Sequence, residues 1–162
     1  MVGLIVGTFL LVSCRPRPIM HAYQPIPGQA WSRTDTLRFD LPYMPDAAES
    51  QVSVGVRCTN QLDYQDLWLV VEQRTALVRR DTVHFIMADL NGQWLSMNPF
   101  LHADELAAGT VSLTTPESQL LVYHVMQPFT VTGISEVGIK VEPVSAFHTV
   151  ASRVDTQQDE QQ

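Results

Sequence analysis

The residue type with the best-defined chemistry in this chain is cysteine, which occurs only at positions 14 and 58. Cys14 closes an uncharged apolar run that begins at Met1, with Leu11 and Ser13 just ahead of it. Such a run is too short to cross a hydrocarbon layer of ~30 Å, but it suits the apolar region of an export signal. A branched residue and a small residue before a cysteine are typical of bacterial lipoprotein signals. We therefore predict a signal peptide over residues 1–13 and lipidation of the Cys14 thiol by a diacylglycerol group.

Lipidation would give the chain a permanent membrane anchor, because two or three acyl chains bind far more firmly than one. The alternative is an ordinary secretory signal in which Cys14 is incidental. No Lys or Arg precedes the apolar run, although such signals normally start with basic residues, so we expect a basic segment upstream of Met1. The charges that follow Cys14 are the basic Arg15 and Arg17, with no acidic run. We therefore expect a lipid-anchored envelope protein that faces the periplasm.

The second cysteine and the net charge argue against a disulfide-linked domain and against a nucleic-acid-binding protein. If Cys14 is lipidated, Cys58 has no partner for an intrachain disulfide, and we expect it to be a small buried hydrophobe. The formal charge of −7 gives the chain no electrostatic reason to bind nucleic acid.

Motifs for catalysis or metal binding are missing from the sequence. The histidines have no ligand spacing such as H-E-x-x-H, and neither a G-x-S-x-G elbow nor a phosphate-binding loop occurs. The Asp89, Asn91 and Gly92 cluster lacks the later acidic ligands of a calcium loop. Four aspartates (Asp63, Asp66, Asp81 and Asp89) could meet in space as a glycosidase pair, but no local feature favours this. We expect no enzyme, no metal and no cofactor.

Strands are the elements that would position these side chains. Apolar and polar residues alternate over 36–41, 51–58 and 136–142, which is typical of half-buried strands. Segments 66–72, 81–88 and 119–126 are apolar on both faces or nearly so, and 66–72 is predicted to be central. The inward residues are predicted to be Leu37, Phe39, Leu41, Val52, Val54, Val56, Cys58, Val137, Ile139 and Val141.

Two local features are predicted between these strands. Asn91-Gly92 favours a tight type I′ hairpin, in which both residues take positive φ angles. Residues 102–108 are predicted to form one or two helical turns that end at Gly109.

The overall pattern predicts an all-β fold, an antiparallel β-sandwich that is jelly-roll-like or immunoglobulin-like, with little helix. Periodicity leaves the strand order open. A lipidated proline-rich tether is expected over 14–30, part of which, around Tyr23 and Ile26, would pack on the domain as an edge. The sandwich would span 31–143, and 144–162 would form a disordered acidic tail.

Aromatic residues supply the candidates for binding. Tyr64, Trp94 and Trp31 form the candidate interaction surface, whereas Trp68 and Tyr123 are expected in the core because aromatic residues within strands are usually buried. An exposed platform of the first three would stack on sugars.

The series of motifs along the chain resembles the GldH family of gliding-motility lipoproteins. The resemblance rests on the cysteine at 14, a Trp-x-x-x-Asp-Thr-Leu-x-Phe segment over 31–39, Val-x-Val-Arg over 54–57, and Asp-Tyr-x-Asp-Leu-Trp-Leu over 63–69. It continues with Asp-Thr-Val at 81–83, Ala-Asp-x-x-Gly-x-Trp at 88–94 and Gly-Ile-x-x-Val-Gly-Ile at 133–139. The chain departs from the family pattern at 94–96 and at 126–127.

The resemblance implies a non-catalytic component of a Bacteroidetes-type cell envelope, associated with gliding or with the linked protein-secretion machinery. Its partners would be other envelope proteins, bound by strand addition at a sheet edge or by an aromatic patch. The alternative is a carbohydrate-binding surface lipoprotein of a polysaccharide-uptake system.

Overall fold

A computed structural model describes residues 17–47, 49–95 and 102–144, without the side chains of 102–104. The regular secondary structure of these residues is almost entirely strand, which confirms the predicted all-β class. A single turn of 3-10 helix, η1, covers Pro27–Gln29. The strands of the first half are β1 (Met20–Pro25), β2 (Ala30–Ser32), β3 (Leu37–Asp40), β4 (Ser50–Cys58) and β5 (Asp66–Arg74). Those of the second half are β6 (Val78–Ile86), β7 (His102–Val111), β8 (Gln119–His124), β9 (Thr130–Thr132) and β10 (Ile134–Pro143).

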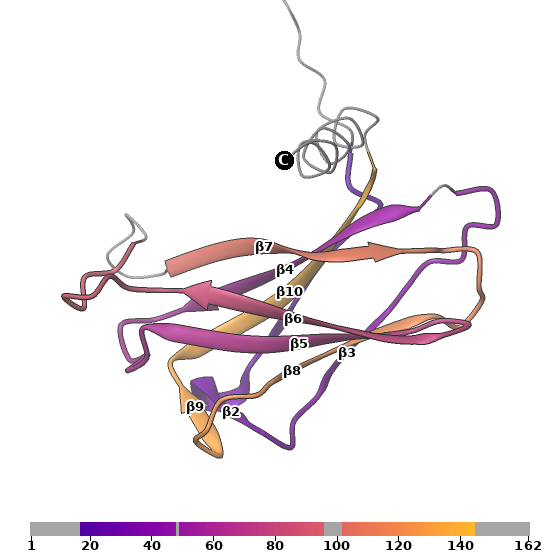
Figure 1. Cartoon of the computed structure of the whole chain (residues 1–162). Coiled ribbons are helices and arrows are strands. Elements are labelled where there is room, and N and C mark those ends of the chain that lie inside the picture. Colours follow the sequence, from indigo (N-terminus) through magenta and orange to yellow (C-terminus); the bar gives the residue numbers. More distant parts are fainter. Residues whose placement is uncertain (1–16, 48, 96–101, 145–162) are drawn as a thin grey trace, which may run out of the picture.

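The strands form a sandwich of two four-stranded antiparallel sheets (Figure 1). One sheet has the order β1-β10-β4-β7 and the other β3-β8-β5-β6, while β2 pairs with β9 beside them. The pairs β5–β6, β4–β7, β3–β8, β2–β9 and β1–β10 are nested like the two arms of one long hairpin. An antiparallel ribbon wrapped into two sheets in this way is a jelly roll, so the structure resolves the choice that periodicity left open.

The core lies between the sheets and follows the predicted alternation. Val52, Val54, Val56 and Cys58 on β4 are all 0% exposed, as are Val137, Ile139 and Val141 on β10. Cys58 lies buried within this core, as predicted. The central position of β5 is also confirmed, because it pairs with β6 on one side and β8 on the other.

The helix predicted over 102–108 is wrong, because these residues begin strand β7. Their alanine content favours a helix locally, but pairing with β4 along the length of the segment overrides that preference. Gly109 has a φ of +91°, which suits a helix end equally well. In β7 it sits instead where the register with β4 shifts between Gln51 and Ser53, so it forms a β-bulge.

The hairpin at Asn91-Gly92 exists, but its turn type differs from the prediction. Gly92 has a positive φ of 77°, whereas the φ of Asn91 is not positive. The Gly92 N–H donates to the carbonyl of Asp89, and the Asp89 N–H to that of Gln93. The loop therefore has three residues and ends on a left-handed glycine, rather than forming a two-residue type I′ turn.

The sheet begins at Met20, well before the boundary expected at Trp31, because β1 pairs with β10. The segment around Tyr23 thus packs on the domain as an edge, and Pro25 stands at the last position of that edge strand, where a missing N–H costs little. The predicted signal peptide over 1–13, the predicted lipidation site at Cys14 and nearly all of the predicted tail over 144–162 lie outside the described residues. Within the described part, none of the helical structure is long and apolar enough to cross a membrane.

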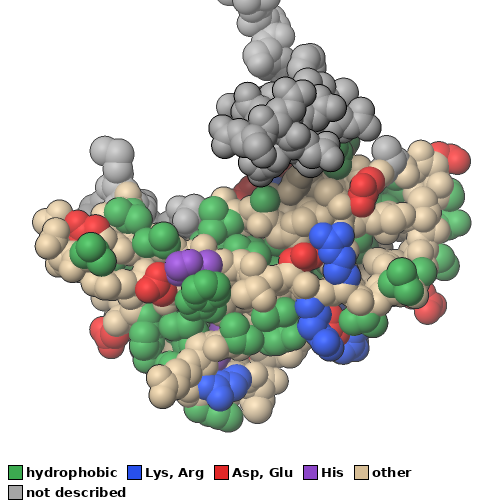
Figure 2. All heavy atoms as spheres, in the orientation of Figure 1, with side chains coloured by type: hydrophobic (Ala, Val, Ile, Leu, Met, Phe, Trp, Pro, Cys, Tyr) green, Lys and Arg blue, Asp and Glu red, His purple; other side chains and the backbone are tan. Residues whose placement is uncertain are grey.

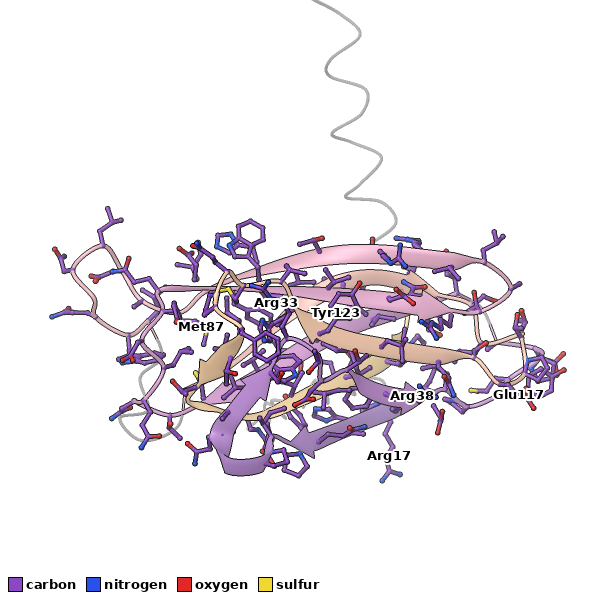
Figure 3. All side chains as sticks on the ribbon, turned by 90° about the horizontal axis from the view of Figure 1, so that it is seen from below. Arg17, Arg33, Arg38, Met87, Glu117 and Tyr123 are labelled. Carbon is purple, nitrogen blue, oxygen red and sulfur yellow. The ribbon has the colours of Figure 1, made fainter. Side chains whose placement is uncertain are left out.

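The sandwich has two ends that matter for function. At one end, hereafter the near end, the chain joins β1 at Met20, and the loops 41–49, 75–77 and 112–118 connect the strands. The opposite, far end carries the loops 59–65, 87–95 and 125–129. Figure 3 shows this division, with Arg17, Arg38 and Glu117 in the right half and Met87 in the left.

Candidate functional site

Trp68 on β5 is the most conspicuous side chain of the far end. Alternation along β5 turns Leu67, Leu69 and Val71 into the core, so Trp68 points to the outer face of its sheet and is 41% exposed. Its ring stacks on that of His84, the facing residue on β6, with centroids 3.9 Å apart and planes inclined by 4°. One face of the indole is therefore covered by an imidazole.

His84 is itself held in place by a carboxylate. Its Nε2 lies 2.6 Å from Oδ1 of Asp66, two residues before Trp68 on β5. In the described part of the chain no hydroxyl or thiol hydrogen-bonds to His84, and no group of three metal-ligating residues gathers. The contact between Asp66 and His84 fixes the imidazole against the ring of Trp68.

A shallow hollow of about 570 Å³ opens beside Trp68. Its other walls come from two far-end loops, and its lining includes Asp63, Tyr64, Met126 and Gln127. The sulfur of Met126 accepts a hydrogen bond from the backbone N–H of Trp68 at 3.3 Å. The hollow thus offers an aromatic ring, carboxylates and an amide to a ligand or to a partner's side chain. In Figure 2, hydrophobic side chains and a histidine gather over this part of the front face.

The wall at Met126 and Gln127 is braced from behind by Arg33, whose guanidinium donates to the carbonyl oxygens of both residues. Next to it, His124 is fully buried, with Nε2 3.2 Å from the carbonyl oxygen of Trp31. Burial lowers the pKa of His124 below its usual value, and the nearby Arg33 adds to this effect. These residues form the rigid support of the hollow rather than its surface.

The candidate interaction surface drawn from the sequence is corrected by these positions. Trp31 is 0% exposed and packs in the core, so it cannot belong to an exposed platform. Tyr64 and Trp94 are half-buried against the core, and only Tyr64 lines the hollow.

The expectation that Trp68 is a core residue is also wrong. The sequence itself indicates an outward Trp68. In a strand, Trp68 lies on the same face as Asp66 and Glu72, whereas Leu67, Leu69 and Val71 lie on the other face.

The four aspartates considered for glycoside chemistry are used in different ways. Asp63 and Asp66 line the hollow. Asp81 pairs with Arg79 on the edge strand β6. Asp89 accepts the N–H groups of Asn91 and Gln93, both at under 3 Å (2.9 and 2.8 Å), and so belongs to its turn.

The model of the family described as GldH lipoprotein matches residues 18–141. The chain belongs to the GldH lipoprotein family. That span contains all strands but the last residues of β10, so the Trp68 hollow and both ends of the sandwich lie within the family's common region.

Among curated proteins, the chain is similar to the gliding motility lipoprotein GldH of Flavobacterium johnsoniae, with 28% identity over 91 residues. The match covers 55% of this chain and 57% of that GldH protein, so it spans little more than half the relative's length. Among solved structures, the Eiger TNF of S. frugiperda is 12% identical with a TM-score of 0.37, covering 80% of this chain and 96% of that one. A likeness this weak carries no functional information.

Proposed function

We propose that this GldH-family chain is a non-catalytic envelope lipoprotein, anchored through Cys14 and associated with gliding motility or the linked protein-secretion machinery. Its jelly roll presents the Trp68 hollow to another envelope protein, on the periplasmic side of the membrane. The family match and the name of the Flavobacterium relative support the motility association.

The observation that carries the binding role is the exposed Trp68 ring. Tryptophan is enriched among the few residues that dominate protein interfaces, particularly where polar groups surround it. Here one face of the ring is fixed by His84 and the other borders a hollow rimmed by Asp63 and Asp66. Ile86 and Val125, exposed by 54% and 48%, extend the apolar surface on either side.

Crosslinked pull-down from native envelopes tests this role. Trp68→Ala removes the ring, and recovery of crosslinked protein partners is expected to fall by about tenfold or more, as for an interface hot spot. Tyr43→Ala is the matched control, because Tyr43 is an aromatic residue with 56% exposure on a near-end loop. Equal partner recovery from both variants would contradict the proposal.

The anchor is tested separately by the intact mass of the chain purified from native membranes. We expect cleavage before Cys14 and acylation of that residue, and loss of membrane association in Cys14→Ala. An unmodified Cys14 thiol in the mature protein would refute the anchor. Protease treatment of intact cells, which degrades surface lipoproteins, is expected to leave a periplasmic chain untouched.

Carbohydrate binding is a second proposal, favoured by one observation. The hollow combines the free face of Trp68 with the side chains of Asp66 and Gln127, and aromatic stacking beside planar polar groups suits a sugar ring. Titration with soluble neutral oligosaccharides would then quench Trp68 fluorescence in the wild type and not in Trp68→Ala. A lack of quenching across the panel would leave the protein-partner proposal alone.

A further inference from the structure

The tip of the β5–β6 hairpin, at the near end, combines exposed apolar residues with arginines. Leu77 and Val78 are 80% and 62% exposed. Arg74 precedes them, and Arg79 and Arg80 follow. Isolated exposed hydrophobes are ordinary, but two adjacent ones among three arginines are unusual in a chain with a net charge of −7.

The carboxylates near the tip hold the guanidinium groups without covering them. Glu72 is buried and accepts from Arg74 and Arg80, each at 2.7 Å, while Asp81 pairs with Arg79 at 3.2 Å. The side chains remain 53% exposed for Arg74, 63% for Arg80 and 52% for Arg79. Three cations against two anions leave the tip positive, and Figure 2 shows Lys and Arg side chains gathered at this place.

The tip lies at the same end of the sandwich as the start of β1. Across the sheet, Arg74 pairs with Val78 on one side and with Gln119 on the other, and Gln119 pairs with Asp40. From Asp40 the loop 41–49 leads to Ser50, which pairs with Pro143, the last residue of β10. The chain joins β1 at this same end, at Met20. Cys14 stands six positions earlier, and six residues reach at most about 20 Å.

From these observations we infer that the β5–β6 tip is a second membrane contact, in which Leu77 and Val78 enter the interface and the arginines face anionic headgroups. This inference rests on the proposed anchoring through Cys14. The acyl chains on Cys14 would hold one point of the chain at the membrane, and a second contact would fix the orientation of the domain. A basic residue near an anionic bilayer strengthens binding about fivefold.

The contact is confined to the tip, because the neighbouring near-end loops carry carboxylates. These are Asp46, Glu49 and Glu117. With the tip and the anchor both on the membrane, the jelly roll stands with its far end, and therefore the Trp68 hollow, directed away from the lipid. The second contact thus sets which surface other envelope proteins meet.

A depth measurement on the full lipoprotein tests the inference. Leu77→Cys is labelled with an environment-sensitive dye, which is selective because Cys58 is buried and Cys14 is proposed to be acylated. Leu90→Cys is the matched control, since Leu90 is 97% exposed on a hairpin tip at the far end. Both proteins are reconstituted into equimolar phosphatidylcholine–phosphatidylglycerol vesicles that contain a doxyl-lipid quencher.

The dye at position 77 is expected to be quenched several-fold more than the dye at position 90. Quenching at 77 should weaken with added salt, in phosphatidylcholine vesicles alone, and in an Arg79→Gln background. Equal quenching at the two positions would overturn the inference. Protection at 77 that grows with the protein-to-lipid ratio would assign the tip to a second copy of the chain, and would overturn it too.

Failure of the anchor is distinguished by two further readouts, namely vesicle flotation and the intact mass of residue 14. A floating, acylated protein without quenching at 77 disproves only the second contact. An unacylated residue 14 disproves the anchor, whatever the quenching.

Discussion

Tyr23 and Trp68 lie on the outer faces of the two different sheets, and their rings are covered to different extents. On the sheet of β1, β10 and β4, the ring of Tyr23 lies over Gly138 and Gly55, and a Cβ on Gly138 would come within 2.6 Å of that ring. The guanidinium of Arg57 covers the ring from 3.9 Å and is itself paired with Glu136. On the opposite sheet, Trp68 stacks on a single imidazole and leaves its second face to the hollow.

The difference lies in what stands beneath each ring. Gly55 and Gly138 face each other and have no side chains, so they leave a trough in which the Tyr23 ring lies. The guanidinium of Arg57 covers the other face of that ring. Trp68 has Val70 beside it and no glycine below, so its ring stands against His84 and remains accessible. The ring of Tyr23 is therefore covered by its own sheet, while the ring of Trp68 is left 41% exposed.

The largest effect is expected from filling the trough. Gly138→Val places a branched side chain where the ring of Tyr23 lies, with three ring atoms within 2.7 Å of the new Cβ. Overpacking of this kind costs up to about 3 kcal/mol, and urea unfolding of the purified lipoprotein would measure it. Thr82→Val on the open face of β6 is the control and should change the free energy of unfolding by less than about 0.5 kcal/mol.

Truncation of the two aromatic residues sharpens the comparison directly. Tyr23→Ala uncovers the glycines and removes the contact with Arg57, so we expect a loss of about 2 kcal/mol in the free energy of unfolding. Trp68→Ala removes a ring that is already exposed on one face, and should cost less than about 1 kcal/mol. Equal losses in urea unfolding would show that Trp68 serves stability as much as Tyr23 does.

The near-end half of the Trp68 sheet carries a cluster of ion pairs around Glu72. Hydrogen bonds from Arg74 and Arg80 hold the pKa of Glu72 below its usual value. This stabilisation is present above pH 4.5, the ordinary pKa of the group, and is lost as the pH falls through the lowered folded-state pKa. Glu72→Gln should cost about 1 kcal/mol at neutral pH and flatten the pH dependence of unfolding in that acidic window. Asp46→Asn, on an exposed loop, should leave that dependence unchanged.

The sequence correctly predicts those strands that have one buried face and one solvent-exposed face. Val52, Val54 and Val56 on β4 are such a case, because alternation alone identifies their inward face. The same alternation along β5 places Trp68 on the outer face, against the general tendency of tryptophan to be buried. Trp31 follows a segment rich in prolines, so no alternation around it indicates that it is buried.

Features that depend on distant pairing could not be predicted locally. Residues 102–108 favour a helix by composition and become a strand only because β4 supplies a partner. The trough under Tyr23 needs Gly55 and Gly138 to face each other across two strands that are far apart in the sequence. The hollow beside Trp68 likewise combines the loop before β5 with the loop after β8, and strand order was not available from periodicity.

The smallest effect is expected from a second pair of residues that differ in exposure, the histidines of the far end. His84 supports Trp68 at the surface, whereas His124 is buried beneath the wall of the hollow, and no hydrogen-bond partner for its Nδ1 exists among the described residues. Because burial lowers the pKa of His124, the unfolded chain takes up a proton at this imidazole before the folded chain does. Stability is therefore full above pH 6.5, the ordinary histidine pKa, and declines as the pH falls from there toward the lowered value.

His124→Gln keeps a donor for the carbonyl of Trp31 and removes the titrating group. Its free energy of unfolding should fall less than that of the wild type as the pH drops below 6.5. His84→Gln, which leaves His124 in place, should retain the decline while weakening partner recovery through Trp68. If His84→Gln instead abolished the decline and His124→Gln preserved it, the surface histidine would be the acid-sensitive one. The buried wall of the hollow would then be indifferent to pH, and the contrast between the two residues would be reversed.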